Sequence, residues 1–143
     1  RRMYPQADIP VVPLAVQPRA SATHHLALGR ALAPLREDGV LLVGSGGFVH
    51  NLGDLEWGRV DAPMPDWAAA FAGWMRERLD AGDTDALLDW ARQAPHARHA
   101  HPTPEHLMPL FFALGAGGEG AGVRSLHRSH EYGSLALDAF AFD

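Results

Sequence analysis

The segment Val40–Val43, which is followed at once by Gly44-Ser45-Gly46-Gly47, constrains the fold more than any other part of the sequence. Four consecutive apolar residues bounded by a turn signal are typical of a strand that is buried in a parallel sheet. A glycine-rich turn at the carboxyl end of such a strand is where α/β proteins place their ligands. The segment therefore predicts a buried strand whose following loop carries a functional site.

The rest of the chain alternates between strand and helix patterns. Pro10 and Pro13 place the first strand at the start or the edge of a sheet. Thr103 and Pro104 form a favourable N-cap and first helical residue for the last helix. The predicted strands span about 9–17, 40–43, 123–127 and 134–142, and the predicted helices span about 21–36, 65–81, 83–95 and 104–114. This order predicts an α/β fold with a mixed or mostly parallel sheet flanked by helices, in which residues 1–143 form a single, partial domain.

Composition excludes several classes of function. The chain has no cysteine, so any metal must be held by His, Asp or Glu. A net charge of −5 with scattered arginines argues against nucleic acid as a partner. No apolar run reaches the ~20 residues that a membrane span requires. The first residues do not resemble a signal peptide, so we expect a cytoplasmic protein with no membrane partner.

The loop after the predicted strand 40–43 contains the first candidate residue, His50. Glycines allow this loop to approach a ligand closely, and an imidazole can transfer protons near neutral pH. A phosphate-binding loop is a weaker interpretation, because no Lys-Ser/Thr pair follows the glycines. A hydrogen-bonded structural histidine is the alternative that the spacing alone leaves open.

The second candidate region is the histidine-rich stretch 96–106. His106 falls near the start of the predicted helix, where the partial positive charge disfavours imidazolium and leaves the neutral imidazole that a metal needs. Glu105 is favoured by the same dipole. His96 and His99 are interpreted as solvated residues, whereas His101 is a candidate for contacts with a substrate or with the metal-binding side chains.

Two further groups have mainly structural interpretations. The segment 127–134, which includes Tyr132, is most simply a polar turn before a strand. Trp67, Phe71 and Trp74 keep helical spacing, which predicts core packing rather than a binding site.

Three stretches together resemble the class III extradiol ring-cleavage dioxygenases. They are residues 3–10 (MYPQADIP), 44–52 (GSGGFVHNL) and 101–110 (HPTPEHLMPL), and the closing 132–135 (YGSL) agrees with them. The resemblance covers essentially the whole chain and is greater to the 4,5-DOPA dioxygenase branch than to the protocatechuate branch. In the latter branch a carboxylate occupies the position that His106 occupies here.

The resemblance implies the C-terminal half of an enzyme that opens a catechol-type, DOPA-like substrate with O₂ at a non-haem Fe(II), with zinc able to take the place of iron. His50 then matches the family's acid/base histidine, and His106 matches the third metal ligand. The matching motifs place His101, Glu105, Asn51 and Tyr132 near the substrate or behind the catalytic and metal-binding side chains. The family's other two metal ligands are histidines of the N-terminal half, and none of the nine histidines here corresponds to them.

Three hypotheses follow. An extradiol dioxygenase predicts that His50 and His106 converge on one cleft, and its partner would be the missing N-terminal half or a second copy of the chain. A zinc hydrolase would instead require His99, His101 and His106 to converge with Glu105 as the base. A truncated, non-catalytic remnant or interaction domain is the third hypothesis, and it predicts an exposed apolar patch where the missing half would pack.

Overall fold

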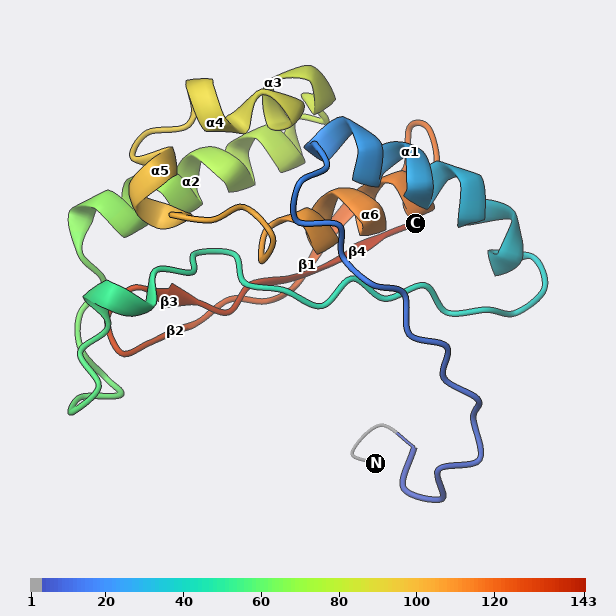
Figure 1. The fold of residues 1–143 in the computed structure, drawn as a ribbon, viewed down its shortest axis with the longest axis horizontal. Coiled ribbons are helices and arrows are strands. Elements are labelled where there is room, and N and C mark those ends of the chain that lie inside the picture. The colour runs from blue at the N-terminus through green and yellow to red at the C-terminus, as the bar shows by residue number, and fades with distance from the viewer. Residues whose placement is uncertain (1–3) are drawn as a thin grey trace.

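Helices cover one side of the molecule and short strands run along the other (Figure 1). The computed structural model describes residues 4–143. The elements, in chain order, are α1 (Ala22–Leu32), the 3-10 helices η1 (Ala33–Arg36) and η2 (Leu52–Asp54), α2 (Asp66–Asp80), α3 (Thr84–Leu88), α4 (Trp90–Gln93), α5 (Ala97–Ala100), α6 (Met108–Gly117), β1 (Val123–His127), β2 (His130–Glu131), β3 (Leu135–Ala136) and β4 (Ala139–Phe142). Between residues 4 and 143, no helix has both the length and the apolar character needed to cross a membrane.

Helices α1 and α6 pack through glycines. A Cβ atom on Gly29 would lie 2.0 Å from the carbonyl oxygen of Phe112, and one on Gly115 would lie 2.1 Å from the carbonyl oxygen of Leu26. Only glycine allows the two helix backbones to approach this closely. Ser21 caps α1, and the helix changes to 3-10 geometry at the turn that contains Pro34.

The core lies between α2, α6 and the segments that lead to them. Phe71, Met75 and Leu79 lie on one face of α2 and are almost completely buried, as is Phe111 of α6. The predicted packing role of the aromatic residues of α2 is confirmed, because Phe71 is in the core and its two tryptophan neighbours pack against it. The helix predicted over 83–95 divides into α3 and α4.

The predicted mixed or mostly parallel sheet is not formed by the described residues. β1 pairs with β4 and β2 pairs with β3, and both pairs are antiparallel. The predicted strands 9–17 and 40–43 have no assigned strand partner between residues 4 and 143, and Val12 and Val43 are 89% and 65% exposed. A strand forms only where a neighbouring backbone completes its hydrogen bonds, so apolar composition alone does not produce one.

The predicted start of the last helix is wrong. α6 begins at Met108, and residues 102–107 form bends and turns. Thr103 does not cap the helix, because its hydroxyl donates to the Glu105 carboxylate at 2.8 Å. Pro109 occupies the first turn of α6, where the missing backbone donor has no cost. His106 therefore precedes the helix instead of lying within its first turn.

Candidate functional site

The loop that carries His50 is held against the backbone of His106. Gly47 donates its backbone N–H to the carbonyl oxygen of His106 at 2.8 Å, and a Cβ atom on Gly46 would lie 2.1 Å from the same oxygen. The backbone N–H of His50 donates to the carbonyl oxygen of Ala100 at 3.0 Å. The glycines that the sequence placed after residue 43 thus allow one loop to contact the histidine-rich segment directly.

His50 and His106 stack on each other. Their ring centroids are 3.6 Å apart and their planes differ by 14°. Burial, and then the charge that His106 can carry, lower the pKa of His50 from its usual value of 6.5. His50 is therefore neutral at neutral pH, which is the form that can accept a proton. The convergence of these two side chains is the geometry that the dioxygenase hypothesis predicts.

Glu105 places a carboxylate beside this pair. Nδ1 of His106 lies 3.2 Å from Oε1 of Glu105, yet this nitrogen is buried and has no hydrogen-bond partner among the described residues. Hydrogen bonds from its own backbone N–H and from the Thr103 hydroxyl lower the pKa of Glu105. The carboxylate is therefore ionised at neutral pH and adds negative charge next to His106.

His101 lies in the core behind the loop. It is 3% exposed, and its Nε2 donates to the carbonyl oxygen of Phe48 at 3.1 Å. The rings of Phe71 and Trp90 lie 5.5 and 5.7 Å from the imidazole, and burial lowers the pKa of His101 to about 4. A neutral His101 thus holds the backbone two residues before His50. A direct contact between His101 and substrate stays a prediction.

Asn51 and His99 brace the other end of the loop. The Asn51 side chain donates to the carbonyl oxygen of His99 at 2.9 Å and accepts from Gly53 N–H at 3.0 Å. The His99 imidazole stacks on Trp67 with centroids 4.0 Å apart and contacts the Asp54 carboxylate. These contacts join residues that are far apart along the chain, so no local sequence pattern indicates them. His99 is consequently engaged away from the His50–His106 pair.

Tyr132 holds a neighbouring loop. Its backbone N–H donates to the carbonyl oxygen of Val60 at 2.9 Å, and its own carbonyl oxygen accepts from Glu56 N–H at 3.0 Å. The Tyr132 ring lies 5.4 Å from that of Trp57. These contacts place Tyr132 in the support of loop 56–60, and its predicted contact with substrate stays a prediction.

The paired histidines fit part of a metal site. The buried Nδ1 of His106 lacks a hydrogen-bond partner, and neutral imidazole is a preferred ligand of divalent iron and zinc. Residues 4–143 contain no group of three or more His, Asp or Glu side chains arranged to hold a metal ion. A complete site of about three protein ligands would therefore need donors beyond those described. The set required by the zinc-hydrolase hypothesis does not come together.

Comparison with known proteins places this geometry in context. Residues 1–139 match the family model described as the catalytic LigB subunit of aromatic ring-opening dioxygenase. The chain is 44% identical over 142 residues to a 4,5-DOPA dioxygenase extradiol of Portulaca grandiflora, a match that covers 98% of this chain and 51% of the relative. It is 38% identical over 128 residues to a 4,5-DOPA dioxygenase extradiol of Escherichia coli K12, with 80% of this chain and 43% of the relative covered.

A solved structure supports the same relationship. The crystal structure of an uncharacterized protein from Escherichia coli K12 superposes with a TM-score of 0.84 at 34% identity, and the match covers 97% of this chain and 57% of that one. The chain spans about half the length of the curated relatives it matches.

Proposed function

This chain belongs to the family of the catalytic LigB subunit of aromatic ring-opening dioxygenases, and on this premise we propose that it supplies one part of the active site of an extradiol dioxygenase. The reaction is the opening of a catechol-type, DOPA-like ring by O₂ beside its two hydroxyls. In this proposal His50 is the acid/base residue and His106 is a metal ligand. The chain would complete its site with further metal ligands from a segment that it does not span.

The single observation that carries the proposal is the stacking of His50 on His106 at 3.6 Å. The two residues come from different motifs of the resemblance, and the loop glycines bring them together through contact with the His106 backbone. If His50 had only a packing role, its ring would not be expected to stack on the histidine of the second motif. The arrangement therefore favours a shared site over two separate packing roles.

The chemistry of His50 suits proton transfer from a catechol. Its lowered pKa leaves the imidazole neutral at neutral pH, so it can accept the proton of a substrate hydroxyl and later return one to the ring-opened product. The backbone N–H of His50 donates to the carbonyl oxygen of Ala100, and the Asn51 side chain donates to that of His99. These hydrogen bonds hold the loop, so that the His50 imidazole has a fixed position. Fixed placement of a base contributes to rate because less orientation is lost when the substrate binds.

His106 is the residue that would hold the metal, with the Glu105 carboxylate offsetting part of the added charge. A divalent iron held there would acidify the substrate hydroxyls and would supply the redox chemistry with O₂. Zinc can occupy imidazole sites of this kind, so the metal that copurifies need not be the one that supports the reaction.

A non-catalytic remnant is the second candidate, and the observation that favours it is the coverage of about half of each curated relative. A chimera separates the two candidates. The full chain is joined to the part of the Portulaca grandiflora relative that the match leaves uncovered, loaded with Fe(II) and supplied with DOPA and O₂. We expect a yellow semialdehyde and consumption of one O₂ per catechol. If the chimera folds and binds iron but does not form this product, the non-catalytic remnant is the candidate that is supported.

Variants of the same chimera test the individual roles. His50→Gln should lower the rate by ~10²–10⁴-fold, the usual contribution of general acid–base catalysis, and should retain iron. His106→Ala should lose iron. His24→Ala, which changes an exposed histidine of α1, is the matched control and should retain both. Equal activity of His50→Gln and the control would remove the acid/base role from His50.

A further inference from the structure

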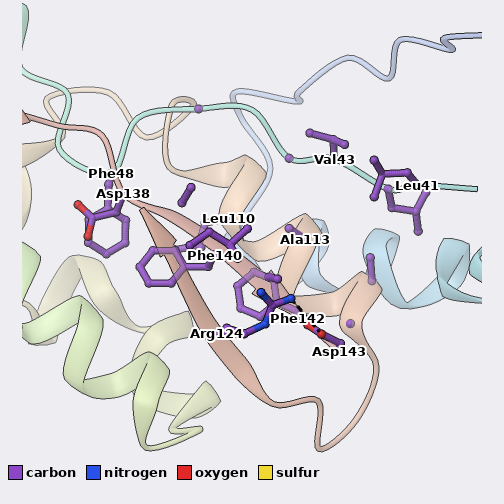
Figure 2. Close-up of a pocket in the computed structure, with 18 of the residues that line it drawn as sticks. Leu41, Val43, Phe48, Leu110, Ala113, Arg124, Asp138, Phe140, Phe142 and Asp143 are labelled. Carbon is purple, nitrogen blue, oxygen red and sulfur yellow. Dashed lines mark hydrogen bonds and ion pairs between the residues drawn. The ribbon is translucent and has the colours of Figure 1, made fainter. Parts of the chain in front are cut away.

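The loop that carries His50 is held in different ways on its two sides. Before His50, the side chains of Phe48 and Val49 are buried. Phe48 packs beside Phe140, with ring centroids 5.3 Å apart, in the wall of an apolar pocket (Figure 2). After His50, residues 52–54 are exposed. Apolar packing therefore fixes the chain that leads to His50, whereas polar contacts must fix the chain that leaves it.

The polar contacts after His50 are made to the end of α5. This helix has only four residues, so the carbonyl oxygens of His99 and Ala100 have no donors within it. The backbone N–H of His50 donates to the Ala100 oxygen at 3.0 Å. The Asn51 side chain donates to the His99 oxygen at 2.9 Å. These two hydrogen bonds hold consecutive residues of the loop, so the orientation of His50 depends on the position of α5.

The imidazole of His99 fixes the position of α5 in turn. It stacks on Trp67 of α2 with centroids 4.0 Å apart and planes that differ by 11°, and it contacts the Asp54 carboxylate. Oδ2 of Asp54 also accepts from the Asn51 side chain at 3.4 Å, so the network is closed. The side chains of His99 and Asp54 are 45% and 42% exposed. Their contacts therefore join the loop to α5 and add little to the core.

We propose that His99 and Asp54 are positioning residues for His50, an inference that rests on the proposed function of His50 in proton transfer. The His50 ring stacks on His106 at 3.6 Å, and the network after His50 holds the backbone conformation that gives this arrangement. Both residues act through the loop backbone: His99 through the carbonyl that Asn51 binds, and Asp54 through its contact with the His99 ring. Displacement of a base lowers the rate more than the substrate affinity, because the exact geometry matters when the proton moves.

Nuclear magnetic resonance of the full chain tests the positioning without catalysis. In the unmodified protein, the stacked rings of His50 and His106 should give nuclear Overhauser cross-peaks between their carbon-bound ring protons. We expect loss of these cross-peaks in His99→Ala and in Asp54→Ala, while the amide spectrum of each variant stays that of a folded protein. Asp54→Ala changes an exposed side chain, so it keeps the test valid if His99→Ala does not fold.

Two control variants separate positioning from general effects. His24→Ala removes an exposed histidine of α1 and should keep the cross-peaks. Leu79→Ala removes a side chain that is 1% exposed near the end of α2, so it should lower the stability of the protein and also keep the cross-peaks. In the iron-loaded chimera, His99→Ala should lower kcat about tenfold or more and change the KM for DOPA by no more than about twofold.

Three results would overturn the inference. These are cross-peaks that persist in both His99→Ala and Asp54→Ala, cross-peaks that are lost equally in Leu79→Ala, and a chimera in which His99→Ala raises KM without lowering kcat. The resonance experiment does not depend on activity. An inactive unmodified chimera would refute the proposed function while the cross-peaks still decide the positioning, and an active chimera in which His99→Ala matches His24→Ala would refute the positioning alone.

Discussion

Replacement of the buried His101 by glutamine should change how the stability of the protein depends on pH. Burial lowers the pKa of His101 to about 4 in the folded protein, whereas the unfolded chain has the usual value of 6.5. Between these values the unfolded state binds a proton that the folded state does not. Stability from this residue is therefore fully present above pH 6.5 and decreases as the pH falls toward 4.

The magnitude follows from the two pKa values. Between pH 7.5 and pH 5, protonation of His101 in the unfolded chain alone should lower the free energy of unfolding by about 2 kcal/mol. His101→Gln keeps a donor for the Phe48 carbonyl but cannot be protonated. The variant is expected to be less stable than the unmodified protein at pH 7.5, and the difference should shrink by about 2 kcal/mol at pH 5.

Urea unfolding at both pH values, with a chelator present to remove any metal, measures this difference. The other histidines are the same in both proteins, so their contributions cancel in the comparison. A stability difference that is the same at pH 7.5 and pH 5 would show that His101 is not held neutral by burial. Its assignment as the support of the His50 loop would then lose its electrostatic basis.

Two further predictions concern packing and charge, and both are read by urea unfolding at neutral pH. Arg76 donates two hydrogen bonds to the carboxylate of Asp138, at 2.7 and 2.9 Å, and the Asp138 side chain is 1% exposed. Arg76→Ala should destabilise the protein by about 3–5 kcal/mol, because it leaves this buried carboxylate without its partner. Arg59→Ala, which removes an exposed ion pair with Glu56, should cost about 1 kcal/mol or less. Gly29→Ala should destabilise by about 1–3 kcal/mol because its Cβ would meet a backbone oxygen of α6. The matched Gly73→Ala in α2 meets no atom within 4 Å and should stabilise by up to about 1 kcal/mol. Similar effects for the members of either pair would contradict the reasoning.

Local signals predicted those elements whose partners are near in sequence. The start of the first helix near residue 21, the core position of Phe71 and the strand 123–127 all follow from short-range patterns, and the structure confirms them. The start of α6 was misplaced because two prolines, Pro104 and Pro109, each offer a valid first turn, and only packing chooses between them. The family assignment also came from sequence motifs, and the match over residues 1–139 confirms it.

The sequence by itself determined which residues could carry chemistry: glycines before His50, and an imidazole and a carboxylate at 105–106. Tertiary structure alone decided how they are used. It stacked His50 on His106, buried His101 behind the loop, and engaged His99 with Trp67. It also left the segment 40–43 without a strand partner. The physical reason is that side-chain identity is local, whereas ring stacking, burial and strand pairing each require a second segment whose position depends on the whole fold.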